Sequence, residues 1–288
     1  MGLWDVERIQ AQVKRSLGRV SDALPRAWGL GQFTQADSCT INDRAIAERA
    51  IVAARCELIP PPPLISIVLP TLNEAQNLPQ VLGTIPAGVD VVVVDGGSAD
   101  CTAEVAKAWG VRVIWSSPGR SHQLNCGAAA ATGSILLFLH ADTRLPEGFE
   151  QAIRQTLAQP GVVAGAFRLA INGPDRGLRW VEWGVNLRSR FLQMPYGDQG
   201  IFIKADIFHQ LGGFPDLPMM EDFELVRRLR KVGRVAIAPA AVVTSDRRWR
   251  TLGILRTTLA NQVMVVSYLL GVDPKKLACW YRHLDKPR

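Results

Sequence analysis

The chain has 288 residues, of which 48% are hydrophobic, so it can bury a substantial core in one large domain or two smaller ones. Lysine and arginine number 33 against 26 aspartates and glutamates, which favours an anionic partner such as a nucleotide, a phosphate or an acidic membrane surface. The five cysteines are dispersed without a Cys-x-x-Cys pair, which argues against a disulfide framework or a structural zinc site and for a reducing cytosol. The first residues lack a basic stretch followed by an apolar one, so we expect no secretory signal.

Residues 1–63 are expected to form an N-terminal helical extension that ends in a proline linker. Apolar residues recur at helical spacing over residues 4–17, and residues 42–58 predict a second helix. The four prolines at 60–63 end that helix, because a polyproline segment is stiff and extended and cannot join a central sheet. We therefore expect the main domain to begin at residue 64.

From residue 64 onward, short apolar strands alternate with helices. Strands are predicted at 64–69, 90–94, 111–115 and 135–139, and helices near 75–83, 100–109 and 122–131. This alternation predicts an α/β fold with right-handed βαβ units and a mostly parallel central sheet flanked by helices. The second half is less regular, with strands predicted at 162–169 and 200–203 and helices at 176–191 and 221–231.

Two carboxylates follow buried apolar strands. Asp95 comes directly after the run 91–94, and Asp142 comes three residues after the run 135–139. A run without polar alternation is typical of a strand covered on both faces, and ligands of open α/β sheets bind beyond the carboxyl ends of such strands. Asp95 and Asp142 therefore predict a site for a polar ligand.

Several short motifs are each weak evidence for a family when taken alone, but their order along one domain is specific. They are Ile67–Glu74 (IVLPTLNE), Val94–Ser98 (VDGGS), Ala141-Asp142, Gly212–Phe214 (GGF) and Met220–Asp222 (MED). From about residue 65 to 247 the chain resembles the family 2 glycosyltransferases, which implies the GT-A nucleotide-diphospho-sugar transferase fold. Within that family it looks similar to small bacterial members described as associated with radical-SAM or selenodomain proteins.

The loop after the first strand is a predicted donor contact. Asn73 can cap the following helix while backbone N–H groups face the pocket. The resemblance implies that this loop, with Pro70, Thr71, Asn73 and Glu74, contacts the nucleotide. The alternative is a plain strand-to-helix turn.

The resemblance also implies that Asp95 hydrogen-bonds the base of the donor nucleotide. Gly96 follows, and glycine lets a ring or a ribose approach the backbone closely. The alternative role for Asp95 is to cap the next helix.

The helix predicted near residue 122 begins with a cationic and amide-rich turn. A phosphate at this turn would gain from Arg120 and from the helix N-terminus. Similarity to related transferases favours donor contacts by Arg120 and Asn125, and the alternative is a solvated basic turn.

His140, Ala141 and Asp142 occupy the place of the family's Asp-x-Asp metal motif. The resemblance implies that Asp142 binds a divalent ion, Mn²⁺ or Mg²⁺, that bridges the donor diphosphate, and that Ala141 lies at the donor. Here histidine replaces the first acid. Imidazole suits Mn²⁺ better than Mg²⁺, so His140 is either a ligand or a residue of the site wall.

Asp222 matches the family's catalytic base. In an inverting transfer, one carboxylate takes the proton of the acceptor hydroxyl while its oxygen attacks the anomeric carbon opposite the diphosphate. Glu221 precedes Asp222, and Gln199 and Gly200 lie in a loop that resembles one facing the transferred sugar and the acceptor. The alternative is two acids that complement a helix dipole.

Residues 247–288 are expected to form an amphipathic helical tail. Arg247, Arg248 and Trp249 precede an apolar stretch at 263–270 that is too short and too polar for a comfortable transmembrane helix. Such a segment can lie on an anionic membrane and offer a lipid-linked acceptor, or it can pack across the catalytic domain.

These features predict a metal-assisted inverting glycosyltransferase that moves a sugar from a nucleotide-diphosphate donor to a small-molecule or lipid-linked acceptor. We expect it in the cytoplasm or peripherally at the inner face of the membrane, without a nucleic-acid partner. A nucleotidyltransferase of similar fold would need a glycine-rich phosphate loop, which residues 70–74 lack. A non-catalytic nucleotide-sugar binder or membrane-associated protein is the other alternative, although Asp142 and Asp222 are both present.

Overall fold

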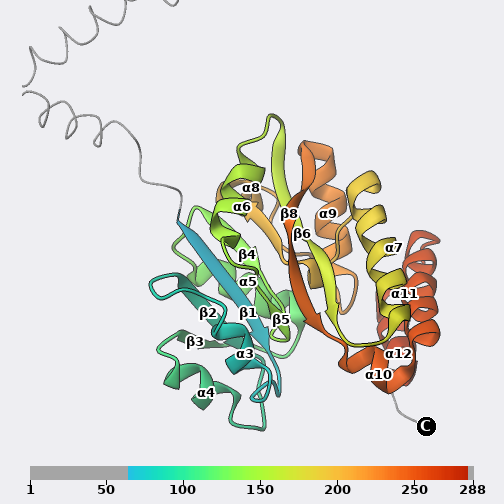
Figure 1. The fold of residues 1–288 in the computed structure, drawn as a ribbon, viewed down its shortest axis with the longest axis horizontal. Coiled ribbons are helices and arrows are strands. Elements are labelled where there is room, and N and C mark those ends of the chain that lie inside the picture. The colour runs from blue at the N-terminus through green and yellow to red at the C-terminus, as the bar shows by residue number, and fades with distance from the viewer. Residues whose placement is uncertain (1–63, 285–288) are drawn as a thin grey trace, which may run out of the picture. The chain divides into compact units, whose positions relative to one another are not determined.

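Residues 64–284 are described by the computed structural model, and they form an eight-stranded sheet flanked by helices (Figure 1). The helices predicted at 4–17 and 42–58 and the linker at 60–63 lie outside the described residues. The α/β architecture that the alternating pattern predicts is therefore confirmed for the domain that follows the linker.

The first half of the domain is a parallel layer. Its strands are β1 (Ile65–Thr71), β2 (Asp90–Asp95), β3 (Arg112–Trp115) and β4 (Ile135–Phe138), connected by α3 (Leu78–Leu82), α4 (Thr102–Ala108) and α5 (Arg120–Ala130). These strands lie in the order β3-β2-β1-β4 and all pair in parallel. β1, β2 and β4 are almost continuously buried, as their lack of polar alternation predicts. α3 is shorter than the predicted helix at 75–83.

Antiparallel pairing completes the sheet. The remaining strands are β5 (Thr143–Arg144), β6 (Val162–Asn172), β7 (Ile201–Lys204) and β8 (Arg234–Ser245). β7 pairs antiparallel with both β4 and β6, whereas β8 pairs parallel with β6 and antiparallel with β5. The sheet is thus mixed, and the prediction of a mostly parallel sheet describes its first half better than its second.

β8 was not predicted from the sequence. This strand contains Pro239, and proline within a run argues against a central strand because it cannot donate to the ladder. The structure accommodates it where the pairing of β6 with β8 shifts register, between Ala166 and Arg168 of β6.

Helices cover the sheet and extend one side of it. They are α6 (Phe149–Leu157), α7 (Arg176–Leu192), α8 (Ala205–Gln210), α9 (Glu221–Val232), α10 (Arg247–Leu252), α11 (Ile254–Leu269) and α12 (Pro274–Leu284). α7, α11 and α12 lie together on the side of the molecule away from β3 (Figure 1). The tail predicted to be helical from residue 247 forms α10, α11 and α12, and all three contribute to the wall of a cavity in the domain.

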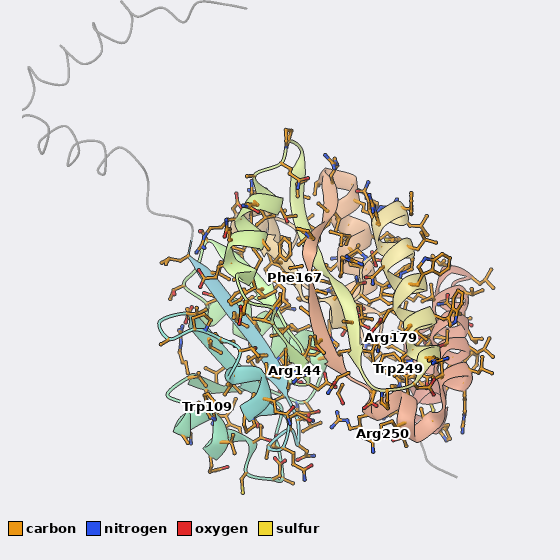
Figure 2. All side chains as sticks on the ribbon, viewed as in Figure 1. Trp109, Arg144, Phe167, Arg179, Trp249 and Arg250 are labelled. Carbon is orange, nitrogen blue, oxygen red and sulfur yellow. The ribbon has the colours of Figure 1, made fainter. Side chains whose placement is uncertain are left out.

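The apolar core lies between the sheet and its helices. Phe167 of β6 is fully buried near the centre of the molecule (Figure 2), and its ring packs edge-to-face on Phe202 with a centroid separation of 5.3 Å. On the other face, Phe138, Phe208 and Phe214 form a second aromatic group. These clusters hold the strands rigidly enough to fix the loops at their ends.

The packing of α5 on the sheet predicts a stability effect. A Cβ on Gly127 would lie 2.3 Å from Val68 Cγ1 and 2.8 Å from Val94 Cγ2. Gly127→Ala should therefore lower the free energy of unfolding by about 1–3 kcal/mol through overpacking, as measured by urea denaturation. The control is Gly184→Ala in α7, because a Cβ on Gly184 would meet nothing within 4 Å. This substitution should raise the free energy of unfolding by about 0.5–1 kcal/mol. A Gly127→Ala protein as stable as the wild type would contradict the close packing.

Candidate functional site

The carboxyl ends of β1 and β2 bring Thr71 and Asp95 side by side in the parallel register. Asp95 is fully buried, and its Oδ1 accepts hydrogen bonds from the backbone N–H groups of Gly97 at 2.8 Å and Ser98 at 2.7 Å. Its Oδ2 is also buried and has no hydrogen-bond partner among residues 64–284. A buried carboxylate oxygen left in this way is an acceptor suited to the N–H or O–H group of a ligand.

Gln123 of α5 clamps these two strand ends together. Its Nε2 donates to the carbonyl oxygen of Thr71 at 2.8 Å and to that of Val94 at 2.9 Å. A Cβ on Gly96 would lie 2.9 Å from the same nitrogen. Gly96 therefore makes room for the clamp, a role that differs from the close ligand approach expected of it.

Asn73 does not cap α3, contrary to the sequence-based expectation. Its φ of 57° is left-handed, its Oδ1 accepts from the Ala99 N–H at 2.8 Å, and its own N–H donates to Ser98 Oγ at 2.9 Å. The residue that precedes α3 is instead Asn77, whose side chain makes no capping bond. Asn73 thus ties the loops after β1 and β2 to each other, which explains why an asparagine is used in a left-handed position.

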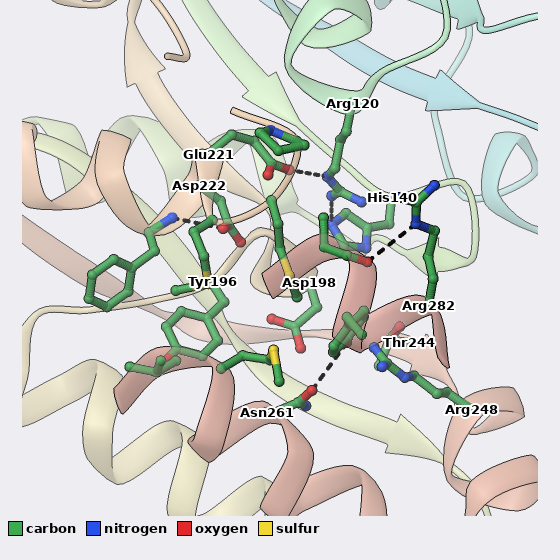
Figure 3. Close-up of a pocket in the computed structure, with 18 of the residues that line it drawn as sticks. Arg120, His140, Tyr196, Asp198, Glu221, Asp222, Thr244, Arg248, Asn261 and Arg282 are labelled. Atoms are coloured by element: carbon green, nitrogen blue, oxygen red, sulfur yellow. Dashed lines mark hydrogen bonds and ion pairs between the residues drawn. The ribbon is translucent and has the colours of Figure 1, made fainter. Parts of the chain in front are cut away.

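A cavity of about 670 Å³ lies between the start of α5, the end of β4, the start of α9 and the helices α10–α12 (Figure 3). Its acidic and imidazole groups are His140, Asp142, Asp198, Glu221 and Asp222. Its basic groups are Arg120, Arg247, Arg248 and Arg282, and its apolar wall includes Met219, Met220, Met264 and Val265. A polar centre of this kind beside an apolar wall is typical of a ligand site.

Arg120 connects three elements of this cavity. Its Nε forms an ion pair with Glu221 Oε1 at 2.9 Å, and its Nη2 donates to His140 Nε2. Burial, assisted by Arg120, holds the pKa of His140 well below its ordinary value, so this imidazole is neutral. Burial and then the neighbouring Asp222 raise the pKa of Glu221, against the effect of Arg120. Because His140 Nε2 accepts from the Arg120 guanidinium, that nitrogen is already occupied in this arrangement and does not face a cation.

Asp222 lies at the start of α9 in a fixed orientation. Its Oδ2 accepts from the Gly197 N–H at 2.6 Å, and its Oδ1 accepts from the Phe223 N–H at 2.7 Å. A Cβ on Gly197 would lie 2.9 Å from His140 Nε2 and 3.1 Å from Asp222 Oδ2, so a side chain there would separate the two groups. Met220, just before α9, has a φ of 70°, a strained value for a residue with a side chain.

Arg247 of α10 bridges two acids from the first half of the domain. Its Nη2 lies 3.0 Å from Glu74 Oε1 and 3.8 Å from Asp142 Oδ2. Burial, followed by the negative charge of Glu74, raises the pKa of Asp142, while Arg247 opposes the shift. Within the described part of the chain, no group of three His, Cys, Asp or Glu side chains could hold a metal. A divalent ion at Asp142 would therefore need most of its ligands from donor phosphates and water, which is the usual way Mg²⁺ binds.

Gln199 and Gly200 do not line the cavity, although they were expected near the sugar and the acceptor. Gln199 is fully buried, with its Oε1 accepting from Ser189 Oγ at 2.7 Å and its Nε2 donating to the Phe167 carbonyl at 3.0 Å. Gly200 has a φ of 62° and backs onto Phe167. Gln199 therefore links α7 to β6.

Asn125 and Ala141 also lie outside the cavity lining. The Asn125 side chain donates to the Phe214 carbonyl at 2.8 Å and accepts from the Phe214 N–H at 2.9 Å. It therefore fixes the Gly212–Phe214 loop. Ala141 is buried between His140 and Asp142. Pro70 and Thr71 end β1 beside Val94 and Asp95, and Glu74 follows the strand; their contact with a nucleotide stays a prediction.

Asp198 lines the cavity but was not predicted as a site residue. Its carboxylate lies between Asp222 and Asn261 (Figure 3), and its buried Oδ1 has no hydrogen-bond partner within the described chain. Burial raises the pKa of Asp198 to about 6, with further contributions from Asp222 and Asp142 against Arg188 and Arg120. The signal was present in the motif Tyr196–Gly200, where the acid adjoins the glutamine that was chosen instead.

Residues 66–211, about half of the chain, match the family model described as glycosyl transferase family 2. The chain belongs to this family. An uncharacterized glycosyltransferase of Mycobacterium tuberculosis is 36% identical over 138 residues, which cover 44% of this chain and 61% of that protein. A PGL/p-HBAD biosynthesis glycosyltransferase of the same species is 40% identical over 96 residues, which cover 30% of this chain and 38% of that protein. The chain thus spans about three fifths of the length of the first of these curated relatives.

Solved structures agree on the GT-A fold. The mannosyltransferase PcManGT from Pyrobaculum calidifontis, in complex with GDP-Man and Mn²⁺, matches with a TM-score of 0.54 and 21% identity, covering 84% of this chain and 78% of that one. TarS of S. aureus, in complex with UDP-GlcNAc, matches with a TM-score of 0.52 and 15% identity, covering 70% of this chain and 66% of that one. At these identities the similarity establishes the fold.

The raised pKa of Asp198, at about 6, predicts how stability changes with pH. The unfolded chain loses this proton near pH 4, whereas the folded chain keeps it to about pH 6, so this group lowers stability as pH rises through that window. Asp198→Asn has no proton to lose, and it should gain about 2 kcal/mol relative to the wild type between pH 4 and pH 7 in urea denaturation. The exposed carboxylate of Asp206 offers the control variant Asp206→Asn, which should show no such gain. A pH-independent difference for Asp198→Asn would contradict the buried environment.

Proposed function

We propose that the protein is an inverting glycosyltransferase that moves a sugar from a nucleotide-diphosphate donor to an acceptor hydroxyl. Membership of family 2 supports the transferase class, and the cavity supports the assignment of groups within it. The observation that carries the proposal is Asp222, a carboxylate held on the cavity wall by two backbone N–H groups. A fixed, cavity-facing carboxylate suits a general base.

In this proposal, the donor nucleotide binds along the edge formed by β1 and β2. The unpartnered Oδ2 of Asp95 accepts a hydrogen bond from the base, and the 70–74 loop contacts the nucleotide. The diphosphate lies at the N-terminus of α5, where Arg120 and the helix dipole offset its charge. The solved neighbours described as complexes with GDP-Man and UDP-GlcNAc support a donor of this class.

The proposal places a divalent ion at Asp142, either Mn²⁺ or Mg²⁺. The residues fit an ion that takes one protein carboxylate and completes its shell from the donor, and PcManGT is described as a complex with Mn²⁺. When bound, such an ion offsets charge on the leaving diphosphate. His140 acts as a wall residue in this arrangement, because Arg120 faces its Nε2.

Transfer then depends on the chain's own groups around the acceptor hydroxyl. Asp222 takes the proton from this hydroxyl, and the oxygen attacks the anomeric carbon from the face opposite the diphosphate. Asp198 accepts a hydrogen bond from a sugar hydroxyl through its unpartnered oxygen. Glu221 orients this region through its ion pair with Arg120, a supporting role in place of the acceptor contact first expected.

The acceptor in this proposal is a small molecule or a lipid-linked molecule, because the polar cavity has an apolar wall of methionines and valine. A cytoplasmic location, peripheral contact of the 247–288 tail with a membrane, and affinity to the radical-SAM and selenodomain-associated members belong to the same proposal. No helix within residues 64–284 is long and apolar enough to span a membrane.

A donor screen tests the proposed function. The purified protein should melt at a higher temperature with at least one of UDP-, GDP- or dTDP-sugars, and more so with Mn²⁺ or Mg²⁺, because ligands that bind the folded state stabilise it. The same donor should be hydrolysed slowly to the nucleoside diphosphate. Asp142→Asn should remove the metal-dependent part of the shift. The proposal fails if none of these donors stabilises the protein with or without metal.

The role of Asp222 has its own test. Asp222→Asn keeps the size of the side chain but removes the base, so transfer should fall by a factor of about 100 or more while the affinity for donor changes little. Donor affinity is measured by calorimetry, and transfer is measured as donor hydrolysis until an acceptor is known. The control is Asp216→Asn, which removes an exposed acid from the preceding loop. Equal losses of binding and turnover in Asp222→Asn would indicate a structural role.

A further inference from the structure

α7 exposes one continuous apolar face. Trp180, Trp183, Leu187 and Phe191 recur at helical spacing, and Trp180 and Phe191 are 74% and 70% exposed. The two tryptophan rings pack edge-to-face with centroids 6.2 Å apart. Scattered apolar residues are ordinary on a protein surface, but a contiguous patch marks an interaction site. No role was predicted for this helix from its sequence.

α11 exposes a second apolar face. Leu255, Leu259, Val263 and Val266 follow one another along the outer side of this helix, and Leu270 continues the row directly after its end. Leu255 and Leu270 are 79% and 80% exposed. The opposite side packs inward through Thr257 and Met264. The outer row therefore consists of apolar side chains that do not take part in packing α11 against the domain.

The two helices adjoin each other. Gly177 in the first turn of α7 approaches Ile254 at the start of α11 so closely that a Cβ on the glycine would lie 2.8 Å from Ile254 Cδ1. α7, α11 and α12 occupy the same side of the molecule (Figure 1), and Trp280 of α12 is also exposed. We call the exposed rows of α7 and α11 the α7–α11 surface.

The charges around the α7–α11 surface are mainly basic. The exposed residues Arg176, Arg179 and Arg190 lie on α7, Arg256 lies on α11, and Lys275 and Lys276 lie on α12. The exposed acids nearby are Asp175 and Asp273, at the starts of α7 and α12. Tryptophan and leucine flanked by arginine and lysine is the composition by which helices lie on an anionic lipid surface.

We propose that the α7–α11 surface docks the protein onto an anionic lipid bilayer, with α7 providing the aromatic half of the contact. This inference deepens the membrane part of the proposed function, on which it rests, because it names the surface and adds a helix outside the tail. A bilayer fits better than a protein groove, since the two rows are convex helix faces with a basic margin.

The position of α11 links this surface to the cavity. Its inner face lines the cavity through Asn261, Met264 and Val265, while its outer face belongs to the α7–α11 surface. A lipid-linked acceptor therefore has only the thickness of one helix between the bilayer and the apolar wall opposite Asp222. Docking in this way brings the acceptor hydroxyl to the base while its chain stays in the lipid.

Vesicle flotation of the full chain tests the proposal. The wild type should float with vesicles of phosphatidylcholine and phosphatidylglycerol, bind phosphatidylcholine vesicles weakly, and lose binding as NaCl is raised. The double variant Trp180→Ser/Trp183→Ser should bind anionic vesicles about tenfold less tightly. Leu259→Ser tests the α11 row independently and should also weaken binding.

The matched control is Trp109→Ser, directly after α4, because Trp109 is 48% exposed and lies on the opposite side of the molecule from Arg179 of α7 (Figure 2). It should bind vesicles like the wild type. The proposal is overturned if the wild type does not bind anionic vesicles, or if the α7 and α11 variants bind as the wild type does. If the protein forms a dimer that dissociates in these variants and does not bind vesicles, the surface belongs to a contact with a second copy. If vesicle binding appears only after residues 1–63 are removed, the surface is an internal contact of the chain. Either result overturns the proposal.

Donor-dependent thermal shifts measured without vesicles separate this proposal from the transferase proposal. The Trp180→Ser/Trp183→Ser protein should keep the wild-type shift with nucleotide-sugar, because neither tryptophan lines the cavity. Vesicle binding without any donor-dependent rise in melting temperature would contradict the transferase proposal alone. A donor-dependent rise in melting temperature without vesicle binding would contradict the docking proposal alone.

Discussion

The ion pair between Arg120 and Glu221 is the contact on which the candidate site depends. Arg120 begins α5 in the parallel half of the domain, and Glu221 begins α9 in the mixed half, so the pair joins two parts built by distant segments. The Glu221 side chain is only 7% exposed. Removing Arg120 would leave this buried carboxylate without its ion-pair partner, and solvent screens only the Arg120 side of the pair, where the side chain is 39% exposed. Because Asp222 is the next residue along the chain, Arg120 positions it by holding its neighbour.

The cavity holds more acidic side chains than Arg120 alone can neutralise. Burial and repulsion from neighbouring acids, chiefly Glu74 and Asp222, raise the pKa values of Asp142, Asp198 and Glu221, which lie around one cavity. Folding tolerates this cost because arginines from three helices face the same space. Perturbed groups of opposite charge gathered at a cavity are characteristic of functional sites, although structural ion pairs also produce them. The arrangement suits a ligand that carries both phosphate and hydroxyl groups, since each set of protein charges then has a partner.

The first half of the fold could be predicted because its strands are buried on both faces and its connections are short helices. β1, β2 and β4 are uninterrupted apolar runs, and residues at their ends such as Asp95 were located correctly as strand-end groups. β8 could not be found in this way, since Pro239 breaks the run and only its irregular pairing with β6 makes room for it. Local pattern carries no information about such tertiary compensation.

Side-chain roles within a motif were harder to predict than the motif itself. Asn125, Gln199 and Asn73 are amides that a sequence reading assigns to ligands, yet each bonds to other parts of the chain in the folded protein. Amides can satisfy backbone donors and acceptors at the same time, so buried loop ends use them for support. Asp198 lacks that versatility, because an ionised carboxylate can only accept. An acid between glycine and glutamine in a cavity loop was therefore the better candidate for a ligand contact.

The two faces of α11 serve different purposes. Packing across the domain and contact with a membrane were opposed as alternatives for the tail, but a helix has two faces and these uses occupy different ones. The inner face packs through Met264, and Asn261 accepts a hydrogen bond from the Tyr281 hydroxyl at 3.2 Å, which explains the polar interruption of the apolar stretch. Packing thus accounts for the inner residues and leaves the outer leucines without a structural purpose. A helix that is apolar on both faces indicates a second apolar environment outside the domain.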